Sequence, residues 1–243
     1  MTVRRRADRL LVERGLFESR AKAQAAIAAG LVIADERPVA KASDEIPVDC
    51  VLRAEAAHPY VSRGGVKLAA ALDHFRFDPR NRVCLDVGAS TGGFTDALLQ
   101  RGARRVYAVD VGHDQLHPSL RAKSEVISIE ATDIRSLDRT HLGELPSFIV
   151  IDVSFISLKP VLAAALALAR PPADLVALIK PQFEAGRQHI KKGIVRDPEV
   201  HTAVCNELNA SVKLLGWHPI DVIPSPVLGG DGNREFLLGA GSG

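Results

Sequence analysis

The stretch LDVGASTGGFTDALL, residues 85–99, decides the fold class. It begins with the end of an apolar run, continues through six residues that include Gly88, Gly92 and Gly93, and finishes with apolar residues at helical spacing. Glycine allows backbone torsions and close approaches that a side chain would prevent. The stretch therefore predicts a strand, a tight turn and a helix.

The same alternation of strand and helix continues on both sides of this stretch, from about Gly64 onward. Apolar runs predict strands in VCLDVG, RVYAVDVG, VISIE, FIVIDVSF and DLVALIK, and closing strands in PIDVIPS and REFLLG. Helices are predicted in GGVKLAAALDHF, FTDALLQRG, SLKPVLAAALALA and EVHTAVCNELNASVKLLGW. Such alternation implies an α/β fold with a mostly parallel sheet and helices on both faces. Ligands of such sheets bind beyond the carboxyl ends of the strands.

The residues before Gly64 predict a separate, small α+β module. Helices are expected in RADRLLVERG and in SRAKAQAAIAAG, where Ser19 is the N-cap and Gly30 the C′ residue. LVIADERPVA predicts a short hairpin, and PVDCVLRAE a further small strand. We expect one domain at residues 1–54, a linker at 55–63 and a second domain at 64–243.

The charge of the chain is balanced overall but uneven locally. With 31 basic and 29 acidic residues, any affinity for nucleic acid must come from a local basic face. Through Lys22 there are seven basic residues against three acidic ones. That surplus is either a face for RNA phosphates or an ordinary solvated helix face.

Three further features restrict the class of protein. The three cysteines are odd in number and lack CxxC spacing, which favours a reducing cytoplasm over a disulfide framework. The apolar run from Val161 is shorter than the roughly 20 residues that a bilayer span needs, so it predicts a core helix. The eight histidines form no short-spaced ligand cluster, so no metal site is expected.

Two cofactors fit the glycine turn. NAD favours GxGxxG, with its pyrophosphate on the helix N-terminus, but here Ser90 stands where the second glycine would be. Asp86 precedes the turn, where its carboxylate can face an amino group. S-adenosylmethionine has no phosphates and carries an ammonium, so the turn favours it over a dinucleotide. A purely structural turn is the third interpretation.

Two more carboxylates follow at the ends of the next predicted strands. Asp110 lies a little over 20 residues beyond Gly88 and can accept hydrogen bonds from both ribose hydroxyls of a nucleoside. Asp133 follows VISIE and can accept from an adenine amino group. The acids favour a nucleoside cofactor over a purely structural turn.

Four other charged residues interrupt or border apolar runs. Asp152 ends FIVID, Lys180 ends LVALIK, Lys67 lies on the helix before the first strand of the sheet, and Glu235 opens the closing strand. Each alone fits a surface position or an ion pair. Together, the two lysines and two carboxylates could converge on one site beside the cofactor.

With these residues the second domain resembles the FtsJ-like RNA ribose methyltransferases, whose mark is a Lys-Asp-Lys-Glu tetrad in that order. The whole sequence resembles the TlyA family, which joins such a domain to an N-terminal RNA-binding module of the ribosomal-protein S-four type. The resemblance rests on the segments RGLFESRAKAQAAIAAGLV, YVSRGGVKLAAAL, CLDVGASTGGFTDALLQRGA, VDVGHDQL, DVSFISLKPVL, ALIKPQFEAGR and GNREFLL.

The resemblance implies a Rossmann-like S-adenosylmethionine-dependent methyltransferase domain with a small N-terminal α+β RNA-binding domain. It implies 2′-O-methylation of ribosomal RNA at cytidine, on ribosomal subunits in the cytoplasm and without a membrane partner. The implied catalytic tetrad is Lys67, Asp152, Lys180 and Glu235. The expected cofactor-binding residues are Asp86, Gly88, Ser90, Gly92, Gly93, Phe94, Asp110, Asp133 and Ile134. The residues expected to meet RNA phosphates are Arg4, Arg5, Arg6, Arg20 and Lys22.

The chemistry gives each member of the tetrad an expected role. A ribose hydroxyl is a poor nucleophile, so the enzyme must align it and loosen its proton. A lysine can accept that proton only when neutral, a form favoured by burial and a neighbouring ammonium and opposed by an adjacent carboxylate. We expect Lys180 to act as base or to steer the hydroxyl, while Lys67 and Glu235 position the ribose.

Rival functions fit the sequence less well. Methylation of pyrimidine carbon five commonly uses a cysteine nucleophile, and no cysteine here adjoins a strand end beside a proline. Methylation of an exocyclic amine usually shows Asp/Asn-Pro-Pro-aromatic where this chain has DVSF. The TlyA family also bears the label haemolysin, but a lytic protein would need a membrane span, an amphipathic membrane helix or a barrel pattern. A non-catalytic RNA-binding or ribosome-assembly protein remains the alternative.

Overall fold

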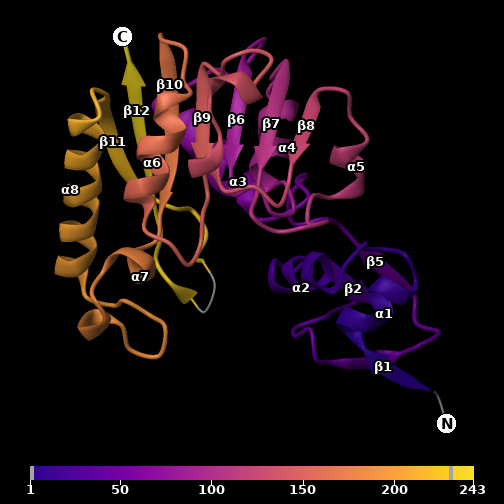
Figure 1. Cartoon of the computed structure of the whole chain (residues 1–243). Helices are drawn as coiled ribbons and strands as arrows, with labels where there is room; N and C mark the ends of the chain where they lie inside the picture. The colour runs from indigo at the N-terminus through magenta and orange to yellow at the C-terminus, as the bar shows by residue number, and fades with distance from the viewer. Residues whose placement is uncertain (1–2, 230–231) are drawn as a thin grey trace. The chain divides into compact units, whose positions relative to one another are not determined.

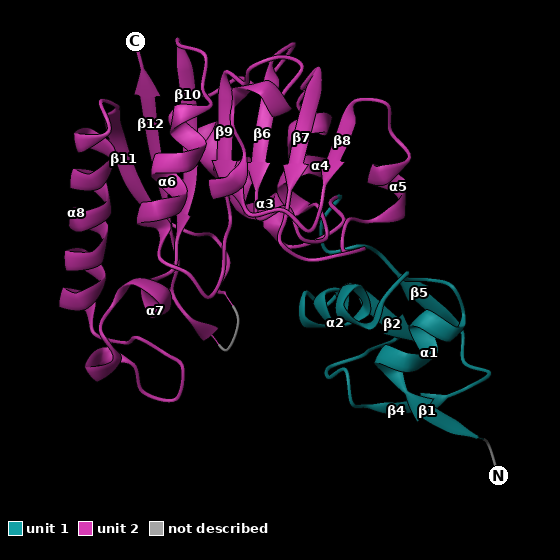
Figure 2. Cartoon of the chain, in the orientation of Figure 1, with its two compact units in different colours: residues 1–59 teal, residues 60–243 magenta. Residues whose placement is uncertain are grey.

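The computed structural model of the chain describes residues 3–229 and 232–243. The chain divides into two compact units, residues 1–59 and residues 60–243 (Figure 2). The division falls within the linker expected at residues 55–63. Each unit has a hydrophobic core of its own.

The first unit is a small α+β domain. Strand β2 lies between β3 and β5, and β1 pairs with β4, all antiparallel. The Ser19 side chain accepts a hydrogen bond from the Lys22 backbone N–H and so caps α2, and Gly30 follows the helix at φ +72°. The elements are β1 (Arg4–Arg6), α1 (Ala7–Glu13), α2 (Arg20–Ala28), β2 (Val32–Ala34), β3 (Arg37–Pro38), β4 (Glu45–Pro47) and β5 (Leu52–Ala54).

The second unit is built on a seven-stranded sheet in the order β11-β12-β10-β9-β6-β7-β8 (Figure 1). Strands β6 to β10 are mutually parallel, and β12 runs antiparallel to both of its neighbours. The predicted mostly parallel α/β sheet is confirmed. The strands are β6 (Val83–Val87), β7 (Arg105–Val109), β8 (Val126–Ile129), β9 (Phe148–Ile151), β10 (Ala173–Ile179), β11 (His218–Pro224) and β12 (Phe236–Ser242).

Helices cover both faces of this sheet. Helices α3 and α4 pack on one face, and α6 and α8 on the other (Figure 1). The α-helices are α3 (Gly64–Phe75), α4 (Gly93–Gln100), α5 (Pro118–Arg121), α6 (Leu158–Ala167), α7 (Pro181–Glu184) and α8 (Pro198–Leu214). Short 3-10 turns are η1 (Ile134–Ser136), η2 (Arg139–His141) and η3 (Arg187–His189).

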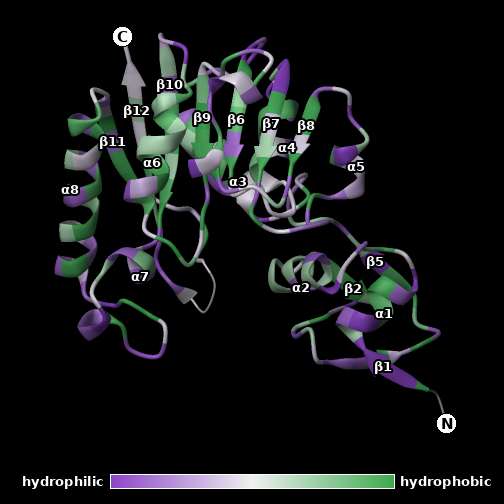
Figure 3. Ribbon diagram, in the orientation of Figure 1, coloured by the Kyte–Doolittle hydropathy of each residue, from purple (hydrophilic) through white to green (hydrophobic). Residues whose placement is uncertain are grey.

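Strand β10 shows why the sheet needs both helical layers. Leu175 and Ile179 pack into the core under α6, whereas Val176 and Leu178 pack into the core under α3 and α4. Alternate residues of a strand point to opposite faces, so a strand buried on both faces is apolar throughout. Figure 3 shows the resulting hydrophobic colour along the central strands.

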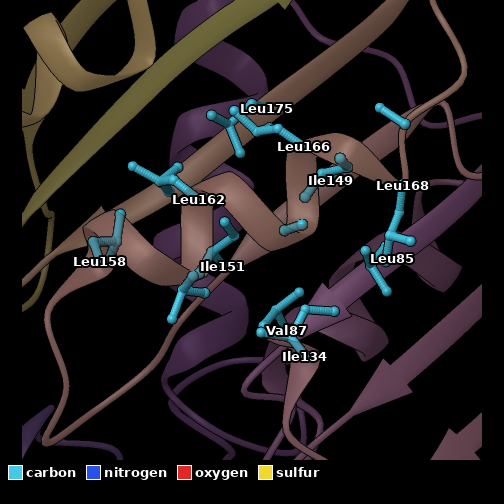
Figure 4. Close-up of a cluster of buried hydrophobic side chains, with 14 of the residues drawn as sticks. Leu85, Val87, Ile134, Ile149, Ile151, Leu158, Leu162, Leu166, Leu168 and Leu175 are labelled. Carbon is cyan, nitrogen blue, oxygen red and sulfur yellow. The ribbon is translucent and has the colours of Figure 1, made fainter. Parts of the chain in front are cut away.

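Helix α6 is the core helix that the sequence predicts. Leu158, Leu162 and Leu166 recur every four residues on one side of the helix and are buried with Ile149 and Ile151 of the sheet (Figure 4). Burial of each such leucine stabilises the fold by about 1.5–3 kcal/mol. Across the described ranges, every helix is too short or too polar to cross a bilayer.

The pairing of β12 with β10 brings the C-terminal strand to the ligand-binding edge. In this antiparallel pair Ile179, the last residue of β10, lies opposite Phe236, the first residue of β12. Residues that follow β10 and residues that precede β12 therefore leave the sheet at the same edge. The carboxyl ends of β6 and β9 lie at that edge too, because these strands are parallel to β10.

Candidate active site

One pocket of about 290 Å³ at the carboxyl edge of the sheet is lined by Arg63 and by the four charged residues of the predicted tetrad. Lys67 comes from α3, Asp152 directly follows β9, Lys180 follows β10, and Glu235 precedes β12. The four residues predicted to form the tetrad are thus gathered by four different elements. All four lie within the second unit.

The tetrad consists of two ion pairs. Lys67 Nζ lies 2.5 Å from Glu235 Oε2, and these side chains are only 10% and 3% exposed. Lys180 Nζ lies 2.6 Å from Asp152 Oδ1 and forms an ion pair with it, although the geometry is not that of a hydrogen bond. Lys180 Nζ also donates a hydrogen bond to Ser154 Oγ at 2.7 Å. Charges this deeply buried require partners, and each lysine has a carboxylate of its own.

Lys67 is placed by a close approach between the N-terminal ends of α3 and α4. A Cβ atom added at Gly93 would lie 3.0 Å from Gly65 N and 3.1 Å from Gly64 Cα, tighter than ordinary contacts with backbone, so glycine favours this approach. The Val61 N–H donates to Asp96 Oδ2 at 2.8 Å and fastens the start of this segment to α4. Ser62 lines the tetrad pocket as well. A single serine in YVSRGG gives no sequence signal for that role, and it was not predicted.

Gly88 and Gly92 have different structural roles in the turn. A Cβ at Gly88, which has φ +83°, would lie 2.4 Å from the Asp152 backbone oxygen. A Cβ at Gly92, which has φ +93°, would collide with the side chains of Leu116 and Leu120. Gly88 therefore lets the turn approach the segment that carries Asp152, whereas Gly92 makes room for apolar packing. Among the predicted turn residues, Gly88, Ser90, Gly93 and Phe94 line the tetrad pocket.

A second pocket, of about 340 Å³, shares part of its wall with the first. It contains Asp110, Asp133 and Ile134, as the sequence predicts, together with apolar side chains. The residues common to both pockets are Gly88, Ser90, Asp152 and Ser154.

Asp110 and Asp133 of this second pocket are held by local contacts. Asp110 accepts hydrogen bonds from the backbone N–H groups of Ser90 (2.8 Å) and Gly112 (2.7 Å). A carboxylate offers about four acceptor positions, so Asp110 can still accept from ribose hydroxyls. Asp133 is held by Arg135 at 2.6 Å, and this guanidinium lowers the pKa of Asp133. Carboxylates above an apolar wall fit a nucleoside that carries an ammonium.

Asp86, which the sequence predicts to bind the cofactor, lies in β6. Its side chain has no exposed surface and lines neither pocket. Oδ2 accepts a 2.6 Å hydrogen bond from Thr95 Oγ1, and Oδ1 has no hydrogen-bond partner in the described part of the chain. Burial raises the pKa of Asp86 to about 7, and the neighbouring Asp152 carboxylate acts in the same direction. The structure thus shows Asp86 supporting the turn and shows no contact of it with a pocket.

In the first unit, two of the predicted RNA-binding residues hold a buried carboxylate. Asp8 has no exposed surface and accepts hydrogen bonds from Arg6 (3.1 Å), Arg20 (2.7 Å) and Gln24 (2.8 Å). The guanidinium of Arg6 is the largest cause that keeps the pKa of Asp8 well below its usual range. Arg6 and Arg20 therefore contribute to the fold of this unit, whatever else they bind.

The other three predicted RNA-binding residues also have partners. Arg4 donates to the Glu45 carbonyl at 2.5 Å, Arg5 pairs with Glu13 at 3.1 Å, and Lys22 pairs with Glu18 at 2.6 Å. Contacts with acidic residues thus offset much of the local positive charge. Binding of RNA phosphates by these five residues stays a prediction. Within residues 3–229 and 232–243, no group of three or more His, Cys, Asp or Glu side chains is arranged to hold a metal ion.

Fold and pocket together define a methyltransferase. Residues 60–242 match the model of the FtsJ-like methyltransferase family, and the chain belongs to that family.

Three relatives extend the similarity over nearly the whole chain. The first is the 16S/23S rRNA (cytidine-2′-O)-methyltransferase TlyA of Mycobacterium tuberculosis, 42% identical over 243 residues, which are 98% of this chain and 90% of that protein. Hemolysin A of Brachyspira hyodysenteriae is 39% identical, covering 96% of this chain and 98% of that protein. A solved structure of a Streptococcus thermophilus protein that carries a haemolysin name has a TM-score of 0.78 at 40% identity, covering 100% of this chain and 90% of that one. The resemblance to the TlyA family is confirmed.

Proposed function

We propose that this chain transfers a methyl group from S-adenosylmethionine to the 2′-hydroxyl of a cytidine in ribosomal RNA. One observation carries the proposal: two lysine–carboxylate pairs line a pocket that shares a wall with a second, acid-bearing pocket. The name of the relative TlyA, an rRNA (cytidine-2′-O)-methyltransferase, supports the substrate and the position. A ribosomal RNA substrate also fits the cytoplasm expected from three cysteines, all of them free.

The second pocket is the proposed cofactor site. Asp110 would accept from the ribose hydroxyls, and Asp133 and Ile134 would flank the adenine. Gly88 and Ser90 line both pockets, so the reacting end of the cofactor would lie beside them. When bound, S-adenosylmethionine supplies a methyl group on a positively charged sulfur, which is already a strong electrophile.

The protein must supply alignment and a destination for one proton. Lys180 is fixed by Asp152 and Ser154, so its Nζ is pre-oriented toward a hydroxyl in the tetrad pocket. As the new carbon–oxygen bond forms, the carbon–sulfur bond would break and the hydroxyl would lose its proton. Because the ion-paired Lys180 is already an ammonium, the Asp152 carboxylate would take this proton, either directly or by exchange through the Lys180 ammonium.

The second ion pair has a different role in this scheme. Lys67 and Glu235 carry opposite charges and add no net charge to the pocket. The pair can nevertheless offer both donors and acceptors to ribose oxygens. It would therefore position the sugar without competing for the proton.

The deciding experiment uses the full-length chain, labelled S-adenosylmethionine, and ribosomal subunits from cells that lack the gene. We expect label in ribosomal RNA, and mapping should place the methyl group on a ribose 2′-oxygen. A methyl group on a base would contradict the proposed chemistry. Tight RNA binding and cofactor binding without any methyl transfer would favour the non-catalytic alternative.

A further inference from the structure

Residues 186–196, GRQHIKKGIVR, form a basic segment that lies directly after α7 and close in sequence to Lys180. A further arginine, Arg234, directly precedes Glu235 of the tetrad. We use the name basic surface for five exposed cations from these two places: Arg187, Lys191, Lys192, Arg196 and Arg234.

Within residues 3–229 and 232–243, the charged groups of the basic surface have no partner. Among the described residues, no ion pair and no side-chain hydrogen bond involves any of the five. The five cations expected from sequence to bind RNA are all engaged in contacts within their own unit. Exposed cations without a partner remain available to an external anion.

The basic segment is fastened to the residues that carry the tetrad glutamate. Asn233, only 3% exposed, accepts a hydrogen bond from the Val195 N–H at 3.3 Å. Its side-chain amide donates to the Gly193 carbonyl at 3.0 Å. Because Asn233 lies two residues before Glu235, this side chain ties the middle of the basic segment to the wall of the tetrad pocket.

Two further contacts shape the basic segment. The Nε2 atom of His201, a buried residue of α8, lies 2.9 Å from the Val195 carbonyl oxygen. Lys191 and Ile194 form a β-bridge, with backbone hydrogen bonds of 2.9 and 3.1 Å. Buried polar side chains that hold a surface turn in one conformation present its cations at fixed positions, which lowers the entropic cost of binding a partner.

We infer that the basic surface binds backbone phosphates of the RNA strand that carries the target nucleotide. The inference rests on the proposed function and names where its substrate strand runs. That strand must enter the tetrad pocket, and the basic surface is joined in sequence to Lys180 on one side and to Glu235 on the other. Phosphate contacts fix register and orientation without reading sequence.

The nearest acidic residues along the segment do not cancel this charge. Asp197 and Glu199 follow it, and the Asp197 side chain is engaged as the N-cap of α8, accepting from the Glu199 N–H at 2.9 Å. Glu184 precedes the segment and is engaged at the start of α6, where it accepts from Ser157 Oγ and the Leu158 N–H. Glu235, next to Arg234, is paired with Lys67. The surplus fits a polyanion.

The test compares two double variants of the full-length chain. Lys191→Ala/Lys192→Ala removes two cations of the basic surface. Lys123→Ala/Lys213→Ala removes two other exposed lysines. They form no ion pair with any residue that the structure describes, and they precede β8 and β11, near the opposite edge of the sheet. The measurement is the dissociation constant for an unmodified ribosomal RNA fragment, as a function of salt concentration.

We plot the logarithm of the RNA-binding constant against the logarithm of the salt concentration. The first variant should flatten the slope of this plot by about 2, since each lost phosphate contact removes about one unit of slope. Its KM for RNA should rise by about tenfold at low salt, while the control variant keeps the wild-type slope. Arg196→Gln/Arg234→Gln should reproduce the effect and guards against a folding defect in the first variant.

Two outcomes would overturn the inference. One is an unchanged salt slope in both basic-surface variants while the wild-type chain methylates RNA, which would leave the proposed function standing. The other is the loss of binding to anionic phospholipid vesicles without any loss of RNA binding, which would assign this surface to a membrane. A wild-type chain that transfers no methyl group would instead refute the proposed function itself.

Discussion

Lys67 and Glu235 form a nearly buried ion pair, 2.5 Å between Nζ and Oε2, although 168 residues separate them in sequence. Removing one partner of such a pair leaves the other charge without compensation, at a cost of about 3–5 kcal/mol. Glu235→Gln should therefore lower both the melting temperature and the methylation rate. Calorimetry and a methylation assay measure the two effects separately.

The matched double variant Lys67→Met/Glu235→Leu separates stability from function. Apolar residues of similar size often replace a buried ion pair without loss of stability. We expect the double variant to recover most of the melting temperature and none of the methylation. Recovery of both would mean that the pair is purely structural.

Lys180 should be required for methyl transfer and dispensable for cofactor binding. Loss of a positioned proton-transfer group commonly lowers a rate by about 10²–10⁴-fold, so Lys180→Ala should lose at least a hundredfold in kcat. Lys159→Ala is the control, because Lys159 also pairs with a carboxylate, that of Glu207, but on the exposed surface. Near-normal turnover by Lys180→Ala would refute the role assigned to this lysine.

Gly88 and Gly102 provide a matched pair of glycines with φ of +83° and +85°. Alanine at either position costs about 1–2 kcal/mol for the left-handed backbone. Only at Gly88 does the new Cβ meet backbone, 2.4 Å from the Asp152 oxygen; at Gly102 the nearest atom is Arg80 Cγ, at 3.3 Å. Gly88→Ala should displace Asp152 and abolish methylation, whereas Gly102→Ala should lose only stability. Equal activity of the two variants would contradict the role of Gly88.

Much of this arrangement follows from simple rules of sequence. Apolar runs show where strands end, and parallel strands share their carboxyl edge, so Asp152 and Lys180 could be expected at one edge. Glu235 is harder, because periodicity does not reveal strand direction. It reaches the edge only because β12 is antiparallel to β10, and its place in the predicted tetrad came from family resemblance.

Other features depend on contacts that a linear pattern does not contain. Asp86 resembles a ligand-facing acid in sequence, yet the Thr95 hydroxyl and complete burial give it a supporting position. The number of basic and acidic residues near the N-terminus does not show that Arg20 forms an ion pair with Asp8. Ser154 contacts Lys180 and lines both pockets, but a single serine in the loop between β9 and α6 has no distinguishing signal in the sequence.

Asp86 should make stability depend on pH in the neutral range. Its folded-state pKa of about 7 lies above its ordinary value of 3.8, so its favourable contribution is complete below pH 3.8 and is lost as pH rises through about 7. Asp86→Asn removes this dependence and can still accept from Thr95. The variant should gain melting temperature relative to wild type at pH 8 and gain less at pH 5.

The control for this pH effect is Asp78→Asn, which changes an exposed aspartate of the same unit. It should shift the melting temperature by a similar small amount at pH 5 and pH 8. If Asp86→Asn followed the same pattern, the buried carboxyl would be ionised throughout this range, contrary to the expected effect of its burial.

Arg20 should contribute to the stability of the first unit as well as to any RNA binding. Its hydrogen bond to the buried Asp8 involves two charged groups, and loss of such a bond costs about 1.5–3 kcal/mol. Arg20→Ala should therefore lower the melting temperature, whereas Arg5→Ala, whose partner Glu13 is exposed, should change it little.

The same cluster predicts loss of stability in acid. The pKa of Asp8 is lowered in the fold, so its contribution is present above about pH 3.8 and is lost as pH falls further. The stability difference between wild type and Asp8→Asn should shrink toward pH 3, as followed by circular dichroism of the full chain.

The prediction for Arg20 has its own contrary outcome. If Arg20→Ala kept the wild-type melting temperature and bound RNA more weakly, Arg20 would act on phosphates alone and Asp8 would not depend on it.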